Sequence, residues 1–221
     1  MTTSSTSSAS ARTEILRRIR AAVGGASNGE VARVGWGRLE RGYRRGGTLE
    51  REPLLELLED RLRDYDAHVV RVGQADVARA VAERLSERRM KRMVVPAGLA
   101  EEWLPQGFEF VVDDGITAAE LDGVDGVMTG ATVAIAETGT VVLQNVPGQG
   151  RRAATLVPDY HLCVVRAEDV VEAVPEAMDR LAATAGIATT FVSGPSATAD
   201  IEMTRIKGVH GPRHLDVILI A

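Results

Sequence analysis

The chain has 221 residues, and 45% of them are hydrophobic, so it can bury a sizeable core and is not an intrinsically disordered protein. Its formal net charge of −5 gives the protein as a whole no long-range attraction for nucleic acid or for an anionic membrane. The single cysteine, Cys163, excludes a disulfide within the chain and an iron-sulfur cluster held by four cysteines of this chain.

Two further expectations come from composition. Cys163 lies in an apolar run, which predicts that it packs as a small buried residue. No apolar run approaches the roughly twenty residues that cross a bilayer, so we expect a soluble protein, and the scarcity of cysteine fits the reducing cytoplasm.

The first residues differ from the rest of the chain. Residues 1–10 are rich in serine and threonine and predict a disordered tail, with an organelle transit peptide as the alternative interpretation. The apolar residues that follow have helical spacing and predict an amphipathic helix, namely Ile15, Leu16, Ile19 and Val23.

Residues 24–48 are rich in glycine and arginine and show no clean periodicity, so they predict a long mobile loop. Arginines interleaved with Trp36 and Tyr43 are able to bind single-stranded nucleic acid, but a solvated arm that packs its aromatics on the body or on a partner subunit fits the acidic chain better. We therefore expect residues 11–50 to form a helix and a mobile arm rather than a nucleic-acid-binding module.

An alternation of helices and strands begins at Pro53. Leucines at helical spacing predict a helix over 53–67, and a second helix is expected over 75–88. Apolar, β-branched runs predict strands at 68–72, 92–96 and 108–112. This alternation indicates an α/β domain with a mixed, mostly parallel sheet flanked by helices.

The middle of the chain departs from this alternation. In residues 126–143, two apolar runs flank Glu137, Thr138, Gly139 and Thr140, which predicts a hairpin with Gly139 at positive φ. Beyond it we expect a strand over 161–165, a helix over 168–185 that is interrupted or begun afresh at Pro175, and buried strands over 188–193 and 215–220. If these last two strands share a sheet, the polar residues between them meet at one edge.

Three segments carry candidate site residues. The hairpin turn places the carboxylate of Glu137 beside two threonine hydroxyls. Residues 147–152 put two glycines before Arg152, and this pattern predicts either an anion-binding nest of backbone amides beside a guanidinium group or a plain surface turn. His161 begins a strand, where it serves as a general base, an anion-binding cation or a structural polar residue.

The segment between the last two strands is unusually polar. Asp200 and Glu202 share a face if the backbone is extended, and their mutual repulsion then raises one of the two pKa values. A metal site built from these two carboxylates and His210 is conceivable, but it matches no compact zinc motif, so no metal is expected.

Three segments of the chain resemble the signature blocks of the lactate utilisation protein C family, the LUD-domain proteins. They are GATVAIAETGTVVL, GRRAATLVPDYHLCVV and the C-terminal block that starts at Ser193, and the helix ARTEILRRIRAA is similar to that family's opening. The resemblance implies a LUD-like domain over 51–221, with a fold similar to those of sugar-phosphate isomerases, class I CoA transferases and 5-formyltetrahydrofolate cyclo-ligase. The block positions that it carries over are Glu137, Thr138, Gly139, Thr140, Arg152, Pro158, His161, Gly194, Pro195, Ser196, Thr198, Asp200, Glu202, His210, Gly211 and Pro212.

The resemblance also implies a function. It points to a bacterial cytoplasmic protein that acts with two iron-sulfur partner proteins in the oxidation of L-lactate to pyruvate, with no cofactor in this chain. The alternative is a free-standing enzyme of the isomerase or acyl/CoA-transferase type, in which Glu137 or His161 acts on an anionic substrate held by Arg152. A homo-oligomer is compatible with both.

Overall fold

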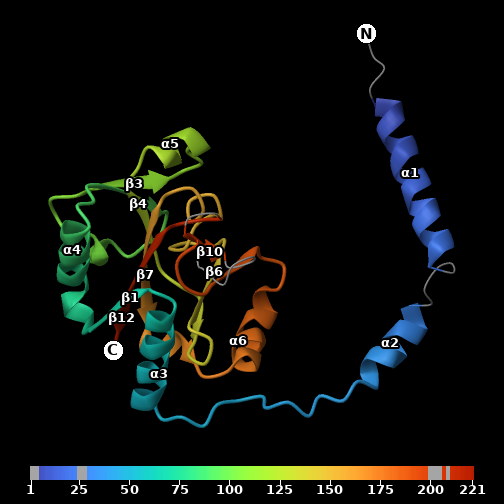
Figure 1. Cartoon of the computed structure of the whole chain (residues 1–221), viewed down its shortest axis with the longest axis horizontal. Coiled ribbons are helices and arrows are strands. Elements are labelled where there is room, and N and C mark those ends of the chain that lie inside the picture. The colour runs from blue at the N-terminus through green and yellow to red at the C-terminus, as the bar shows by residue number, and fades with distance from the viewer. Residues whose placement is uncertain (1–4, 24–28, 199–205, 208–209) are drawn as a thin grey trace. The chain divides into compact units, whose positions relative to one another are not determined.

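The computed structural model describes residues 5–23, 29–198, 206–207 and 210–221 (Figure 1). Two compact units make up the chain, Met1–Tyr43 and Arg44–Ala221. The candidate sites that the structure describes all belong to the second unit.

The first unit contains the helices α1 (Ser5–Ala22) and α2 (Gly29–Gly37). Helix α1 starts inside the segment whose composition predicts a tail, and ion pairs from Glu14 to Arg17 and Arg18 support it at helical spacing. Helix α2 lies within the predicted loop, and the guanidinium of Arg41 lies 4.8 Å from the ring centre of Trp36. This arginine and this aromatic residue of the predicted arm therefore stack on each other.

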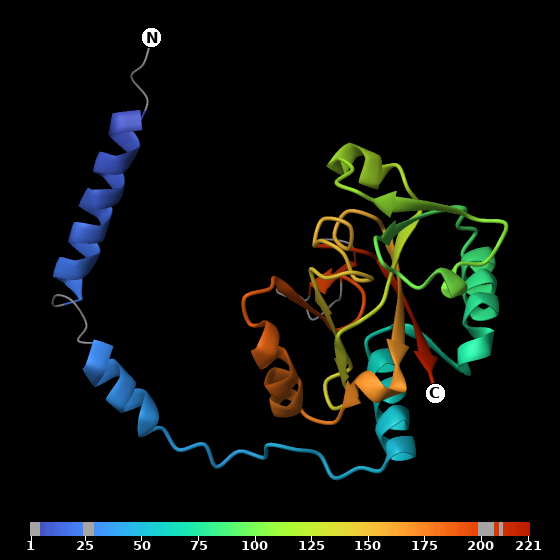
Figure 2. The same cartoon turned by 180° about the vertical axis from the view of Figure 1, so that it is seen from behind.

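The second unit is built around a six-stranded sheet in which every neighbouring pair is parallel (Figures 1 and 2). The central strands are continuous apolar runs because helices or loops cover both faces of the sheet. The α/β fold class predicted from the sequence is confirmed. In spatial order the strands are β1 (His68–Val72), β12 (His214–Ile220), β7 (Tyr160–Arg166), β4 (Gly126–Thr129), β2 (Arg92–Pro96) and β3 (Glu109–Asp113).

The predicted hairpin forms, with Gly139 at φ +56° in its turn, but it lies in a second sheet and not in the parallel one. A Cβ at Gly139 would lie 2.8 Å from the backbone carbon of Arg61, so the turn packs directly on the end of a helix. The strands of this sheet, in spatial order, are β8 (Val170–Val171), β5 (Val133–Ile135), β6 (Thr140–Gln144) and β9 (Thr189–Val192).

One expectation about the C-terminal region was wrong. Strand β9 is not buried: it lies at the edge of the second sheet, and Phe191 is 49% exposed. Since β12 belongs to the parallel sheet, β9 and β12 do not share a sheet, so the condition set for a polar edge between them is not met. Between β9 and β12 the structure describes the short pair β10 (Ala197–Thr198) and β11 (Ile206–Lys207), together with residues 193–196 and 210–213.

The helices separate the layers of the second unit. Helix α4 (Val77–Glu87) covers one face of the parallel sheet, and α3 (Arg51–Asp64) packs between the opposite face and the second sheet. Helix α6 (Val174–Leu181) covers the outer face of the second sheet, as Figures 1 and 2 show. Short helical segments complete the unit: α5 (Ala118–Asp122), η1 (Gln74–Asp76), η2 (Glu101–Trp103), η3 (Ala167–Asp169) and η4 (Ala182–Thr184).

Two alternatives were predicted at Pro175: an interruption of a longer helix, or the start of a new one. The structure shows the second, because α6 starts with Pro175 in its first turn. Proline fits the first turn of a helix, where its missing N–H is not needed, and Glu176 accepts a hydrogen bond from the amide of Ala173. The first part of the predicted helix was wrong, because residues 168–171 contribute to η3 and β8 instead. The apolar Val170 and Val171 complete the second sheet beside β5.

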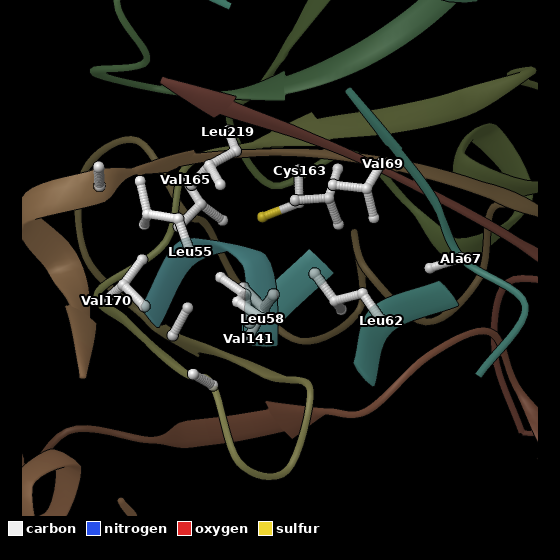
Figure 3. Close-up of a cluster of buried hydrophobic side chains, with 14 of the residues drawn as sticks. Leu55, Leu58, Leu62, Ala67, Val69, Val141, Cys163, Val165, Val170 and Leu219 are labelled. Carbon is white, nitrogen blue, oxygen red and sulfur yellow. The ribbon is translucent and has the colours of Figure 1, made fainter. Parts of the chain in front are cut away.

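Figure 3 shows the core between α3 and the parallel sheet. Leu55, Leu58 and Leu62 of α3 meet Val69 and Cys163 of the sheet, all of them buried. The prediction that Cys163 is a buried packing residue is confirmed, and burial raises the pKa of its thiol to about 12. Such a thiol remains protonated and unreactive at neutral pH.

No helix within the described residues is both long and apolar enough to span a bilayer.

Candidate functional site

A cavity of about 140 Å³ lies beside the amino-terminal ends of β7 and β12. We call it the His161 cavity. It brings together five of the residues predicted as site residues, which come from three separate segments: Arg152, His161, Gly194, Ser196 and His210.

His161 is the most deeply buried polar residue of this cavity, with 2% of its surface exposed. Its Nε2 lies 2.8 Å from the hydroxyl oxygen of Thr129, a buried residue at the end of β4. The two strands are parallel neighbours, and Thr129 is opposite Cys163, two residues further along β7 on the same face as His161. The other ring nitrogen, Nδ1, makes no hydrogen bond to any described residue.

Burial and the positive charge of Arg152 lower the pKa of His161 to about 4. The imidazole is therefore neutral at neutral pH, with one nitrogen protonated and the other able to accept a proton. A neutral, buried histidine with one anchored nitrogen is suited to work as a base or as a hydrogen-bonding group, and not as a cation.

Arg152 supplies the positive charge of the cavity. Its side chain is largely exposed, and Nη1 donates to the carbonyl oxygen and to the hydroxyl of Thr155, both at 3.2 Å. These two contacts leave most of the guanidinium donors available to an anion. Arg152 also forms no ion pair with a described residue, so the cavity can accept a negatively charged ligand.

The opposite wall of the cavity is held by backbone contacts. The amide of His210 donates to the hydroxyl of Ser196 at 2.9 Å, and the amide of Ser196 donates to the carbonyl of Pro212 at 2.8 Å. Gly194 has φ +85°, and a Cβ there would lie 2.4 Å from the Cβ of Tyr65. Gly194 and Ser196 thus shape this wall, and the imidazole of His210 is exposed beside it.

The hairpin turn lies outside this cavity. Glu137 forms an ion pair with Arg44, which also contacts Glu172 at 2.8 Å. Thr140 connects the turn to the cavity wall, because its hydroxyl lies 2.7 Å from that of Thr138 and 2.8 Å from that of Ser193. The structure therefore separates Glu137 from His161, and a site that uses both of them as catalytic groups receives no support from this geometry.

The predicted nest of backbone amides does not form. The amide of Gly148 donates to the carbonyl of Ala97 at 2.8 Å, and the amides of Gln149 and Gly150 both donate to the carbonyl of Val146 at 3.1 Å. Since these donors are already used, they cannot cradle an anion, and the segment is a turn in which Gly148 and Gln149 are buried.

The remaining predicted residues are placed only in part. Thr198 lies in β10, paired with Ile206, while Asp200 and Glu202 lie outside the described residues. No cluster of three or more potential metal-ligating side chains occurs among the residues that the structure describes.

Sequence reasoning missed Thr129, Thr155 and Ser193, which hold or connect the predicted residues. Thr129 carried a usable signal, because it is a polar residue at the end of the otherwise apolar strand β4. Its contact with His161 depends on which strands are neighbours, and the local pattern of residues does not contain that information.

The chain is similar in sequence to a known protein family and to several of its members. The family model described as the LUD domain matches residues 55–220. A protein of Deinococcus radiodurans named "Lactate utilization protein C" is 45% identical over 175 residues, which are 78% of this chain and 82% of that protein. A protein of Bacillus subtilis with the same name is 31% identical over 135 residues, 56% of this chain and 55% of that one.

The fold has a close counterpart among solved structures. The crystal structure of a DUF162 family protein from Deinococcus radiodurans matches with a TM-score of 0.70 and 39% identity, and the match covers 79% of this chain and all of that chain. The family model and the first of these relatives each cover most of the chain. The chain therefore belongs to the LUD-domain family.

Proposed function

We propose that this chain is a component of L-lactate utilisation that acts with two iron-sulfur partner proteins in the oxidation of L-lactate to pyruvate. The observation that carries the proposal is the 45% identity, over most of both chains, to a protein named for lactate utilisation. A second relative with the same name supports it across a shorter segment.

The low cysteine content supports the proposal that the iron-sulfur clusters are bound by partner proteins. Oxidation of lactate to pyruvate releases two electrons and two protons, and the electrons require a carrier. Iron-sulfur clusters are usually held by four cysteine thiolates, but this chain has one cysteine, which is buried with a raised pKa. Clusters that accept these electrons would therefore belong to partner proteins.

The His161 cavity supports a role in binding a small anion. Arg152 offers guanidinium donors to a carboxylate, and the neutral imidazole of His161 offers a group that accepts a proton. Both side chains line one cavity of about 140 Å³, which has room for a small carboxylate.

Co-purification tests this proposal. The chain, carrying an affinity tag, would be purified from cells grown on L-lactate and, as a control, from cells grown on pyruvate. We expect two additional proteins and bound iron with acid-labile sulfide in the lactate sample. Recovery of the tagged chain alone, with no iron-containing protein in either sample, would contradict the proposal.

A free-standing enzyme of the isomerase or acyl/CoA-transferase type is the second candidate, favoured by the presence of Arg152 and His161 in one cavity. A ligand that binds only the folded state raises the melting temperature. Under this alternative, sugar phosphates or CoA esters stabilise the isolated chain and fail to stabilise the Arg152→Gln variant. An unchanged melting temperature with every one of these ligands counts against it.

A further inference from the structure

A second cavity, of about 180 Å³, lies at the opposite, carboxyl end of the parallel sheet. Its walls come from segments that follow β2 and β4, from the last residue of β7, and from Trp103 of η2. We call it the Trp103 cavity. Ligands of open α/β sheets bind in the crevice beyond the carboxyl ends of the strands, so this cavity has the position expected of a binding site.

Trp103 is the first observation that points to a ligand. Its side chain lines the cavity and is buried, with 5% of the residue exposed. Its Nε1 has no hydrogen-bond partner among the described residues. All other buried side-chain nitrogen and oxygen atoms in the described part of the chain have a partner. An unpaired buried donor costs about 1 to 3 kcal/mol, so the packing of the chain alone leaves this wall of the cavity unsatisfied.

Arg166 is the second observation. Its guanidinium lies 5.1 Å from the ring centre of Trp103, and Nη1 donates one long hydrogen bond of 3.5 Å to Gln74. Arg166 makes no ion pair with any described residue. A stacked guanidinium is held in a fixed plane while its edge donors stay available, which suits the recognition of a carboxylate.

Gln149 adds a further donor. Its Oε1 accepts from the hydroxyl of Thr132 at 2.8 Å and from the amide of Gln144 at 2.7 Å. The backbone donor fixes the orientation of the side-chain amide, so Nε2 is the group left over, and it has no partner within the described part of the chain. Gln149 lines the cavity together with Trp103 and Arg166.

Glycines keep the walls of the cavity close to one another. Gly98 has φ +80°, and a Cβ there would lie 2.8 Å from the Cβ of Pro147. The amide of Gly130 donates to the carbonyl of Gly148 at 2.8 Å, which ties the segment after β4 to the turn at 147–150. The glycine-rich turn that fails to form an anion nest thus forms a wall of this cavity.

Asp169 sets a condition on the ligand. Its carboxyl lines the cavity, and burial, followed by the nearby charge of Glu168, raises its pKa. A ligand that carries only acceptors would face this carboxylate unfavourably. A ligand that also carries a hydroxyl would donate to it.

We propose that the Trp103 cavity binds a small hydroxycarboxylate, whose carboxylate accepts from Arg166 and Gln149 beside the ring of Trp103 and whose hydroxyl donates to Asp169. The ligand class follows from the side chains of the cavity, and only the choice of L-lactate as a probe rests on the proposed function. The volume of about 180 Å³ has room for a small ligand of this class.

Intrinsic fluorescence provides a direct readout, because the chain has two tryptophans, Trp36 and Trp103. In the full-length Trp36→Phe variant, Trp103 is the sole tryptophan. Titration with L-lactate should produce a saturable change in its emission. Propionate, which has the same carbon skeleton without the hydroxyl, should bind about tenfold more weakly or worse, equivalent to about 1.4 kcal/mol.

Variants made in the Trp36→Phe background assign the response to one cavity. Arg166→Gln and Gln149→Glu should each abolish saturation, the second by placing an acceptor where a donor is needed. Arg152→Gln, in the His161 cavity, and Arg92→Gln, in an exposed ion pair, should leave the response unchanged. Circular dichroism and the melting temperature establish that each variant is folded, and the two different substitutions guard against loss of binding through misfolding alone.

The opposite results would overturn the proposal. One such result is the absence of any saturable change in fluorescence up to the solubility limit of L-lactate. Another is a fluorescence response that survives Arg166→Gln in a folded protein, and a third is a response that is lost in Arg152→Gln. Equal affinity for propionate would overturn the role of the hydroxyl. Because these measurements use the isolated chain, they can fail while partner proteins still co-purify, so failure of this inference and failure of the proposed function are distinguishable.

Discussion

The hydroxyl of Thr129 lies 2.8 Å from Nε2 of His161, and both side chains are buried between neighbouring parallel strands. The same hydroxyl lies 3.7 Å from the sulfur of Cys163, whose S–H faces the carbonyl of Gly130. This chain of polar contacts satisfies Nε2 inside an apolar region and leaves Nδ1 as the nitrogen available to a ligand.

Removal of the Thr129 hydroxyl tests this relationship. Thr129→Val keeps the shape of the side chain but leaves Nε2 of His161 buried without a partner, so we expect the free energy of unfolding to fall by about 1 to 3 kcal/mol. Thr129→Ser keeps the hydroxyl and should lose less. Urea unfolding measures both variants, and equal stabilities for the two would show that the hydrogen bond contributes nothing.

The pKa of His161 predicts a pH dependence of stability. The unfolded chain binds a proton on this histidine near its ordinary pKa of 6.5, whereas the folded chain binds it only at about pH 4. The stabilising contribution is therefore complete above pH 6.5 and is lost as the pH falls towards 4, by roughly 3 kcal/mol in total.

The His161→Gln variant isolates that contribution. It should be less sensitive to pH than the parent protein between pH 6.5 and 4, when the free energy of unfolding is measured in urea across this range. His214→Gln, at an exposed position, is the matched control and should keep the parent's pH dependence. If His161→Gln and the parent lose stability in parallel, the histidine is not the group responsible.

Asp216 holds the amino end of β12 to helix α4. Its carboxylate, 1% exposed, accepts from Arg84 at 3.1 Å, from Arg88 at 2.8 Å and from the hydroxyl of Tyr160 at 3.0 Å. Asp216→Asn leaves Arg88 without its counter-charge and leaves Arg84 with Glu87 alone, so it should lower the free energy of unfolding by about 3 kcal/mol or more.

An exposed ion pair provides the control for Asp216. Glu109 and Arg92 lie 2.9 Å apart on the surface, and Glu109→Gln should cost less than about 1 kcal/mol. Both variants would be compared by urea unfolding. A loss at Asp216 no larger than the loss at Glu109 would contradict the structural role assigned to the buried carboxylate.

Gly139 is required by its conformation and also by its surroundings. Alanine there has to adopt φ +56° and would bring its Cβ to 2.8 Å from the backbone of Arg61. Gly107 also has a positive φ, +91°, but no atom lies within 4 Å of a Cβ at that position. We expect Gly139→Ala to lower the melting temperature more than Gly107→Ala, and equal shifts would mean that the packing against α3 has no effect.

Much of the fold follows from local sequence patterns. Each strand of the parallel sheet is a short apolar run, and the hairpin turn is marked by Gly139. The patterns do not specify which sheet a strand joins. Strand β9 is apolar enough to be mistaken for a core strand, but among the described strands it pairs only with β6, and β12 lies in the other sheet.

In the candidate sites, too, local sequence patterns identify some residues, and others come together only through the fold. Arg152 and His161 are close in sequence and line one cavity together. Trp103 and Arg166 are far apart in sequence and lack any motif, so their stacking arises only when the segments after β2 and at the end of β7 meet at the carboxyl end of the sheet. Glu137 has the chemistry of a catalytic group, but Arg44 neutralises it.

Growth of a strain that lacks this chain tests the central proposal most directly. L-Lactate as the sole carbon source should fail to support this strain, while pyruvate, the product of the oxidation, should support it, and the intact gene should restore growth on L-lactate. Equal growth of the deletion strain and its parent on L-lactate would contradict a role of this chain in L-lactate utilisation.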